Sequence, residues 1–296
     1  MADAARTARA LVAALRMPQW VKNVLVFVPV VLDHEFTNAD AVSRAFLGFA
    51  AFCLAASAGY IFNDIHDIEA DRKHPEKRRR PFAAGTLSVG AGKIAAGLLL
   101  AAAAGISLLL PPDFRALLLV YLISTASYSL WFKEIPVLDV LILASLYALR
   151  VLAGIAAAEV RFSAWLLAFA MFLFLSLAFV KRYSELFRLR AESATAADRR
   201  GYTVDDLSWL GSMGASAGYL SVLVLALYID SPQVRLLYTE PWMLWLACPL
   251  LLYWIGRMWM KAHRGRIAED PIVATARDPV SYGIAAIMAL ILAAAL

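Results

Sequence analysis

Long apolar stretches separated by polar segments form the main pattern of this 296-residue sequence. A helix needs about 20 apolar residues to cross the hydrocarbon core of a bilayer, and several stretches approach that length. The pattern predicts an amphipathic segment at 1–18 and then about nine membrane-spanning helices. The predicted spans lie at 20–32, 41–63, 92–110, 114–132, 137–158, 162–180, 207–229, 240–260 and 280–296. The first span is short and contains Pro29, so we expect it to tilt or kink.

The composition also indicates a membrane protein. Hydrophobic residues make up 62% of the sequence and the mean hydropathy is +0.68, whereas a soluble domain is about half apolar. We therefore expect an all-α integral membrane protein whose single domain spans 1–296 in the lipid bilayer. Cys53 and Cys248 lie inside apolar stretches, so we expect buried thiols and not disulfide partners or metal ligands.

The distribution of basic residues predicts how the helices cross the membrane, because cytoplasmic loops are enriched in Lys and Arg. If the N-terminus is cytoplasmic, four of the 28 Lys and Arg residues fall on outside segments. They are Arg44, Arg115, Arg161 and Arg235. This predicts a multi-pass protein of the plasma (inner) membrane whose N-terminus is cytoplasmic, with cytoplasmic loops at 64–90, 181–206 and 262–279. The net charge of +5 then follows the topology and requires no nucleic-acid partner.

A cluster of acids follows the second predicted span. Asp64, Asp67 and Asp71 are spaced so that they fall within about 60° of one helix face, with Asn63 at its margin. Such close carboxylates repel one another unless a cation lies between them, and Mg²⁺ commonly bridges carboxylates to substrate phosphates. We predict a Mg²⁺ site on these four residues. A solvated acidic helix end is the alternative, and Glu69 is expected to face solvent.

A run of bases from Arg72 to Arg80 lies in the same loop. Loops on the cytoplasmic side collect bases in any membrane protein, so the run alone does not indicate a site. Its position beside the acids favours phosphate binding, because arginine side chains pair well with phosphate oxygens. Lys77 and Arg80 are the main candidates, together with Arg72.

Further groups of polar residues are expected on the cytoplasmic side, at the start of the first span, around the turn after the fourth and at the end of the sixth. They supply the candidate substrate-binding residues Lys22, Tyr128, Lys133, Asp139, Lys181, Arg182, Tyr183 and Glu185. Charges within spans are rare and usually functional, but Asp139 and Arg150 could instead pair with neighbouring helices. Lys181 and Glu185 are four residues apart, and a simple helical ion pair is their alternative.

Residues 63–71 resemble the first signature, Asn-Asp-x-x-Asp-x-x-x-Asp, of the UbiA superfamily of membrane transferases. The resemblance implies a ring of helices around a central cavity open to the cytoplasm, with Mg²⁺ held by aspartates at its mouth. A homo-oligomer, a trimer, would follow by analogy. Ordinary members transfer a prenyl chain from its diphosphate and carry a second Asp-x-x-x-Asp motif after the sixth helix. Here Asp198, Asp205 and Asp206 lack that spacing.

Several segments are similar to the decaprenyl-phosphate phosphoribosyltransferase branch of that superfamily. They are 19–23, 74–81, 138–141, 149–154 and 181–186. This resemblance implies Mg²⁺-dependent transfer of the 5-phosphoribosyl group from phosphoribosyl diphosphate to a polyprenyl phosphate, for synthesis of a lipid-linked arabinose donor. Diphosphate would be released, and Asp64 and Asp67 would be catalytic.

Two other functions stay open. A prenyl-diphosphate transferase acting on an aromatic acceptor is the alternative enzyme, and the departure from the second motif disfavours it. A transporter whose acidic loop binds cations is an alternative from another class. Transporters usually carry charged or broken helices at mid-membrane, whereas nearly all charges of this chain are predicted at one face. Release of diphosphate would distinguish the enzymes from the transporter.

Overall fold

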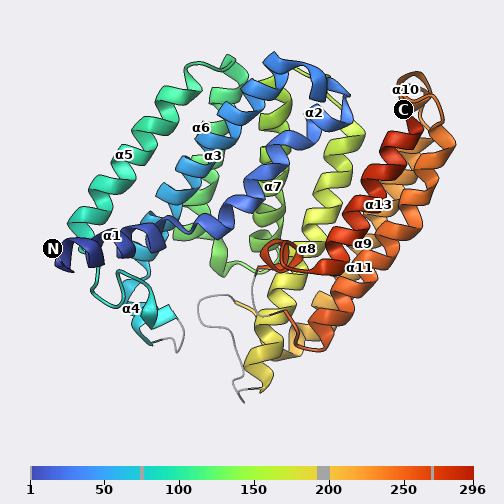
Figure 1. Cartoon of the computed structure of the whole chain (residues 1–296). Coiled ribbons are helices and arrows are strands. Elements are labelled where there is room, and N and C mark those ends of the chain that lie inside the picture. The colour runs from blue at the N-terminus through green and yellow to red at the C-terminus, as the bar shows by residue number, and fades with distance from the viewer. Residues whose placement is uncertain (1, 74–76, 192–200, 268–269) are drawn as a thin grey trace. The chain divides into compact units, whose positions relative to one another are not determined.

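The computed structural model describes residues 2–73, 77–191, 201–267 and 270–296 (Figure 1). The described residues form helices and no β-strand, as the hydrophobic pattern predicts. The chain folds into two compact units. Unit 1 comprises Met1–Leu130 and Leu149–Arg161, and unit 2 comprises Trp131–Ala148 and Phe162–Leu296. Helix α7 (Leu138–Ala158) therefore contributes residues to both units.

Unit 1 contains the N-terminal helices. In chain order they are α1 (Ala2–Leu15), the 3₁₀ helix η1 (Met17–Phe27), α2 (Val28–Leu32), η2 (Glu35–Thr37), α3 (Ala39–His66), α4 (Ile68–Lys73), η3 (Lys77–Arg79), α5 (Val89–Ser107) and α6 (Pro112–Leu130). The first predicted span is thus a 3₁₀ segment followed by a short α-helix. Pro29 lies in the first turn of α2, where its missing N–H leaves no helical hydrogen bond unmade.

Small residues allow the helices of unit 1 to approach closely. α3 contacts α1, η1, α5 and α6, and it buries a row of alanines that includes Ala41, Ala45 and Ala51. A Cβ added at Gly154 of α7 would lie 2.2 Å from the backbone oxygen of Val26 in η1. Glycine is therefore required for this approach, as is common where membrane helices pack.

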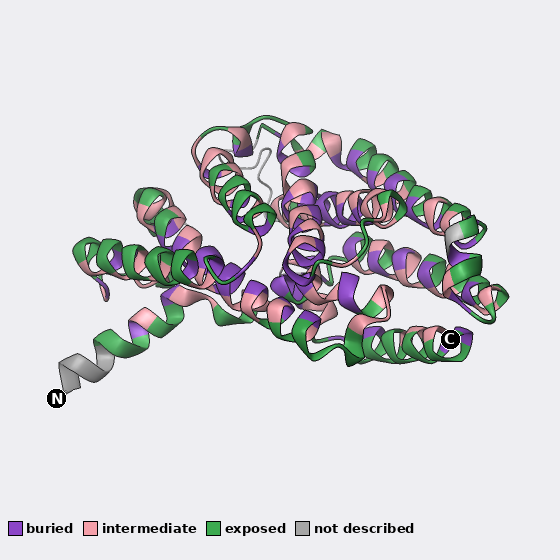
Figure 2. Cartoon of the chain, turned by 90° about the horizontal axis from the view of Figure 1, so that it is seen from above, coloured by how far each residue is buried: buried purple, intermediate pink, exposed green. Residues whose placement is uncertain are grey.

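The exposed face of α5 in unit 1 is largely apolar. α5 exposes most of its side chains (Figure 2), and Ile94 and Leu98 are about two-thirds exposed, at 68% and 67%. Exposed aliphatic side chains along a whole helix are costly in water and favourable in lipid. This face of α5 therefore fits contact with the bilayer.

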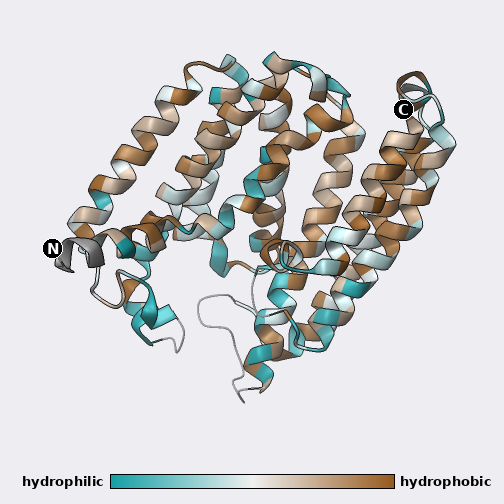
Figure 3. Cartoon of the chain, in the orientation of Figure 1, coloured by the Kyte–Doolittle hydropathy of each residue, from teal (hydrophilic) through white to brown (hydrophobic). Residues whose placement is uncertain are grey.

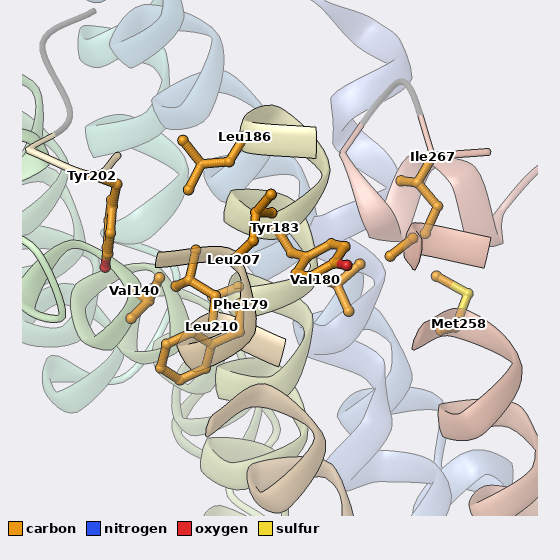
Figure 4. Close-up of a cluster of buried hydrophobic side chains, with 12 residues drawn as sticks. Val140, Phe179, Val180, Tyr183, Leu186, Tyr202, Leu207, Leu210, Met258 and Ile267 are labelled. Atoms are coloured by element: carbon orange, nitrogen blue, oxygen red, sulfur yellow. The ribbon is translucent and has the colours of Figure 1, made fainter. Parts of the chain in front are cut away.

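Unit 2 contains the remaining helices. They are η4 (Phe132–Glu134), the first half of α7, α8 (Ala164–Ala191), η5 (Val204–Asp206), α9 (Leu207–Ile229), α10 (Pro232–Leu237), η6 (Pro241–Leu246), α11 (Ala247–His263), α12 (Pro271–Thr275) and α13 (Pro279–Ala295). α8 packs along α9. Figure 4 shows the buried cluster between them, in which Phe179, Val180 and Leu186 of α8 meet Leu207 and Leu210 of α9.

α8 is longer than predicted. The predicted span ends at 180 and 181–206 is predicted as a loop, but the helix continues to Ala191. Hydropathy falls at Lys181 because the chain becomes charged, as the teal colour along the end of α8 indicates (Figure 3). The charged residues are good helix formers, and Leu186 keeps one face of this extension buried. The polar end of α8 is therefore helical up to Ala191 and not a loop.

Seven helical segments of the described chain are long and apolar enough to cross a membrane. They are Thr7–Leu32, Ala39–His66, Val89–Ser107, Leu138–Ala158, Ala164–Ala191, Val204–Ile229 and Pro241–His263. The remaining predicted spans lie on α6 and on α13, a shorter apolar helix of 17 residues. These apolar helices indicate an integral membrane protein, and the count of nine spans stays a prediction.

Candidate active site

Two buried aspartates of unit 1 lie against the same arginine. Asp64 and Asp71 are 2% and 3% exposed. Nη1 of Arg80 lies 2.7 Å from Oδ2 of Asp71 and 3.2 Å from Oδ1 of Asp64. The spacing of the acids in the sequence predicts that they share a face, and the structure brings these two together on one cationic nitrogen.

The backbone between the two aspartates explains their alignment. α3 ends at His66 and α4 begins at Ile68, so Asp67 is a junction residue. Its N–H nevertheless donates to the carbonyl of Asn63 at 2.9 Å, and its own carbonyl accepts from Asp71 at 2.8 Å. These bonds preserve helical spacing across the junction, with Asn63 and Asp67 half-buried beside the aspartate pair.

A second arginine neutralises the aspartate pair. Nη2 of Arg16 donates to Oδ1 of Asp64 at 2.5 Å, and its guanidinium carbon lies 5.2 Å from the centre of the Tyr60 ring. Arg16 connects α1 to η1 with a left-handed backbone, φ 52°, which is uncommon outside glycine. The sequence carries no signal that assigns Arg16 to the acids, because they lie 48 residues apart.

The donor set of this cluster fits a divalent cation. Among the described residues, no three His, Cys, Asp or Glu side chains lie close enough together to hold a metal ion. Mg²⁺ does not need three, because it commonly uses one or two carboxylates and completes its shell with water and phosphate oxygens. Asp64 and Asp71 already converge on one positive charge, which is the arrangement that a bridging cation requires.

The other bases predicted near the acids occupy varied positions. Arg72 is exposed and its Nε donates to the carbonyl of Ala83 at 3.3 Å. Lys77 is exposed on η3, which precedes Arg80. The exposed Glu69 faces solvent, as expected. Arg80 is therefore the member of the basic run whose side chain the structure places on both aspartates.

Lys22 and Tyr128 also belong to unit 1. Lys22 is 8% exposed on η1, and Tyr128 is half-buried on α6. The residue after Lys22, Asn23, accepts a hydrogen bond from Nε of Arg150 at 2.8 Å. Nη2 of Arg150 donates to the Tyr121 hydroxyl at 3.0 Å. Arg150 is thus paired with neighbouring helices, which is the structural alternative for this charge within a span.

A buried ion pair lies at the polar end of α8 in unit 2. Arg182 is 1% exposed and Asp139 is fully buried. Nε of Arg182 donates to Oδ2 of Asp139, and Nη1 donates to Oε2 of Glu185 at 2.6 Å. The hydroxyl of Tyr202 donates to the other oxygen of Asp139 at 2.8 Å. This pairing satisfies a carboxylate that burial alone would make unfavourable.

Tyr202 is a member of this network that the sequence does not reveal. It lies 63 residues from Asp139. Its oxygen also accepts a hydrogen bond from the N–H of Val137 at 2.7 Å. Burial raises the pKa of the Tyr202 phenol above its ordinary value, so the hydroxyl stays protonated and donates to Asp139. The local sequence shows only that Tyr202 follows Gly201 in a polar segment, and this does not identify Asp139 as its partner.

The turn before α7 is strained where it presents Asp139. Val137 has φ 68°, a conformation that a β-branched residue rarely adopts. Gly201 has φ 66°, and a Cβ there would lie 2.5 Å from the carbonyl oxygen of Glu134. Glycine therefore allows the segment carrying Tyr202 to lie against the turn. Lys133, in η4 of the same turn, is 5% exposed.

Lys181 does not pair with Glu185 in the described contacts. Its Nζ lies 3.4 Å from Oδ2 of Asp270, and the hydroxyl of Tyr147 lies 3.4 Å from Oδ1 of the same carboxylate. Asp270 also caps α12 by accepting from the N–H of Ile272 at 3.2 Å. The alternative of a helical ion pair between Lys181 and Glu185 therefore does not hold in the described contacts. Glu185 pairs with Arg182, and Lys181 pairs with Asp270, which lies far along the chain.

Tyr183 lies apart from its charged neighbours. Its hydroxyl lies 2.9 Å from Nδ1 of His263. Its ring stacks on Phe187 and meets the edge of Trp259. Figure 4 shows it within the hydrophobic cluster, with Met258 and Ile267 also labelled. The structure thus brings Arg182 and Glu185 together but directs Tyr183 to the packed core.

Comparison with known proteins supports the resemblance. Residues 30–276 match the model of the UbiA prenyltransferase family. The chain is 37% identical over 276 residues to an uncharacterized protein, y4nM, of Sinorhizobium fredii, covering 93% of this chain and 54% of that protein. The chain therefore spans about half the length of this relative. It is also 37% identical over 217 residues to the decaprenyl-phosphate phosphoribosyltransferase of Corynebacterium glutamicum, covering 71% of this chain and 65% of that protein.

The fold resembles solved structures of the same family. A UbiA homologue of Archaeoglobus fulgidus, solved with GPP and Mg²⁺ bound, superposes with a TM-score of 0.72. The alignment covers 96% of this chain and 97% of that one, at 17% sequence identity. Similarity at this level of identity shows a common fold.

Proposed function

The chain belongs to the UbiA prenyltransferase family, and from this premise we propose that it transfers a phosphoribosyl group. The donor is phosphoribosyl diphosphate, the acceptor is a polyprenyl phosphate of the decaprenyl type, and diphosphate is released. The observation that carries the proposal is the convergence of Asp64 and Asp71 on Arg80. This cluster combines acids for a metal with a base for phosphate.

The name of the Corynebacterium glutamicum relative supports this choice of substrates over prenyl diphosphates. A second observation supports it too. Ordinary prenyl-transferring members carry a second aspartate motif after the sixth helix, whereas this chain has bases there. Lys181 and Arg182 stand at the polar end of α8. Basic residues suit a substrate set with phosphate at both the sugar and the lipid.

The metal ligands proposed from the sequence are Asn63, Asp64, Asp67 and Asp71, and Asp64 and Asp71 are the two acids of this set that converge on Arg80. When bound there, Mg²⁺ supplies neutralisation of the leaving diphosphate. Arg80 already contacts both buried carboxylates, so its guanidinium is positioned for phosphate oxygens that share the metal. Lys77 and Arg72 are the further bases of this group.

The reaction exchanges one bond at C1 of the ribose for another. The bond between C1 and the diphosphate oxygen breaks, and its electron pair leaves with diphosphate. An oxygen of the polyprenyl phosphate forms the new bond to C1 from the opposite face. Because that oxygen is already anionic, no side chain has to remove a proton. The chain's contribution is to orient both phosphates and to exclude water.

The remaining polar residues are proposed to hold the sugar and the acceptor. Buried Lys22 and Lys133 and half-buried Lys181 are candidates for phosphate groups. Tyr128 and Glu185 are candidates for ribose hydroxyls, whereas Tyr183, which the sequence also suggests, lies in the packed cluster of unit 2. Asp139 is a positioning residue, since its contacts fix Arg182 in place. Phosphoribosyl diphosphate is soluble, so we propose a plasma-membrane protein whose N-terminus and charged loops face the cytoplasm.

Prenyl transfer from a prenyl diphosphate to an aromatic acceptor is the second candidate. The solved Archaeoglobus fulgidus homologue with GPP and Mg²⁺ favours it. The two candidates differ in the donor they use. Purified protein in detergent is given radiolabelled phosphoribosyl diphosphate and polyprenyl phosphate, with and without Mg²⁺. Labelled lipid formed only with metal supports the proposal, whereas label transferred only from a prenyl diphosphate moves the protein to the second candidate.

A pair of variants tests the metal site. Asp67→Asn removes a charged ligand at nearly constant volume, and it should lower turnover by about 100-fold, or about 3 kcal/mol of transition-state stabilisation. Glu69→Gln is the matched control, since Glu69 is exposed two residues away. It should leave turnover within about twofold of the unaltered protein. Equal losses in both variants would contradict the assignment of the metal face.

A further inference from the structure

Two buried polar atoms on the polar end of α8 have no hydrogen-bond partner among the described residues. They are Oγ of Ser184 and Nε of Arg188. Ser184 is 4% exposed as a whole. Buried polar groups in native proteins are nearly always satisfied, so each exception needs an explanation. Within the described residues, these two atoms lie one helical turn apart and therefore on the same side of α8.

The hydroxyl of Ser184 lacks the hydrogen bond to the preceding turn that two other helical serines of this chain make. Ser145 donates to the carbonyl of Leu141 at 2.9 Å, and Ser221 donates to that of Gly218 at 2.6 Å. This return to the preceding turn is the usual way for a buried serine to be satisfied in a helix. The Ser184 hydroxyl makes no such bond, so it is available to an external acceptor.

The Nε–H of Arg188 likewise makes no hydrogen bond in the described structure, although the side chain as a whole is half-buried. Two carboxylates of unit 2 already accept from other bases, because Glu185 accepts from Arg182 and Asp270 lies against Lys181. A buried N–H without an acceptor is unfavourable. It becomes favourable when an anion with several oxygens binds, because a guanidinium donates to two oxygens at once.

We propose that Ser184 and Arg188 bind a phosphate group of a substrate. Ser184 offers an O–H donor and Arg188 offers N–H donors. The two residues are one helical turn apart, so both can donate to the same phosphate group. Lys181 lies three residues before Ser184 on the same side of the helix, and its 3.4 Å contact to Asp270 is a long one. The proposal rests on the proposed function for the substrate's identity, and it adds two binding residues to the candidates named above.

The phosphate could belong to the soluble sugar diphosphate or to the lipid acceptor, and steady-state kinetics separate the two. Arg188→Gln should raise the KM for one phosphate substrate by at least about tenfold and leave the KM for the other unchanged. Ser184→Ala should raise the same KM by a smaller factor. Arg190→Gln is the control, because Arg190 is exposed two residues further along α8, and it should change neither KM. Both KM values unchanged in both variants would overturn the proposal.

A binding measurement keeps this test separate from the proposed reaction. Inorganic pyrophosphate without metal should raise the Tm of the unaltered protein, and Arg188→Gln should lose most of that shift. Without anion, Ser184→Ala should melt at or above the Tm of the unaltered protein, because it removes an unsatisfied group. A lower Tm for Ser184→Ala, with the pyrophosphate shift intact in Arg188→Gln, would assign the pair to packing. A protein that transfers no phosphoribosyl group but shows these shifts would overturn the reaction and keep the anion site.

Discussion

The buried pair between Arg182 and Asp139 allows a quantitative prediction. Arg182→Met keeps most of the aliphatic volume but leaves the fully buried carboxylate of Asp139 with the hydroxyl of Tyr202 as its neutral donor. Removing one partner of a buried pair costs about 3–5 kcal/mol. Because the Tyr202 hydroxyl still donates to Asp139 in this variant, we expect a loss of unfolding free energy at the lower end of this range, about 3 kcal/mol. In a chain of this length, that loss lowers the Tm by about 6 °C.

The chain offers a matched control for this substitution. Arg235 and Asp230 form the same kind of pair at 3.1 Å, but their side chains are 68% and 70% exposed. Exposed pairs contribute about 1 kcal/mol or less, so Arg235→Met should shift the Tm by no more than about 2 °C. The comparison isolates burial, because the residue types and the substitution are the same.

A double substitution tests the cause of the loss. Arg182→Met combined with Asp139→Leu removes the buried charge together with its partner, and such apolar replacements are often nearly neutral. We therefore expect the double variant to regain most of the lost Tm. Tryptophan fluorescence is followed during heating, in one detergent and at one scan rate. An Arg182→Met variant that melts with the Arg235→Met control, or a double variant less stable than the single one, would refute this reasoning.

Two further predictions concern packing and pH. Gly154→Ala should lower the Tm by the equivalent of about 1–3 kcal/mol, because the new Cβ would lie 2.2 Å from the backbone oxygen of Val26. Gly97→Ala is the control and should not lower the Tm, because a Cβ at Gly97 has open space around it. A higher Tm for Gly154→Ala would contradict the close approach. Hydrogen bonding from Arg257 holds the pKa of Asp278 in the folded protein well below its ordinary value. The ionised carboxylate therefore stabilises the fold at every pH above the ordinary pKa of about 4. This stabilisation is lost as the pH falls through the lower pKa of the folded state. The Tm difference between the unaltered protein and Asp278→Asn should therefore stay constant from pH 7 to pH 5, and a difference that shrinks in this range would contradict it.

The helical architecture and part of the candidate site follow from local periodicity. Asp64 and Asp71 are seven residues apart, about two helical turns, so any helix through them places them on one face. The structure keeps this spacing even across the junction at Asp67. The pairing of acids with the basic run was also predictable in kind. The sequence could not predict which base would contact the two aspartates, because Lys77 and Arg80 both lie in the basic run.

The parts that the sequence could not predict depend on long-range contacts. Asp270 lies 89 residues from Lys181, and no local pattern links the two. Helix geometry allows Glu185 to meet Lys181 or Arg182, and the contact of Lys181 with Asp270 decides between them. The extension of α8 beyond residue 180 was missed for another reason. Hydropathy identifies the part of a helix that is apolar enough to contact lipid, but the helix itself can continue into a polar segment, as α8 does.

In the described part of each unit an arginine joins two carboxylates, and the two arginines differ in exposure. Arg182 holds Asp139 and Glu185 with a side chain that is 1% exposed, so its donors are already committed to carboxylates inside the packed helices. Arg80 holds Asp64 and Asp71 with a side chain that is 25% exposed. A phosphate arriving from solvent therefore meets Arg80 directly. Both bridges keep acids together that would otherwise repel, but only the exposed one allows its cation to exchange carboxylate oxygens for phosphate oxygens. This difference supports our proposal that substrate phosphate binds at the cluster of unit 1, and it favours a supporting role for the pair of unit 2.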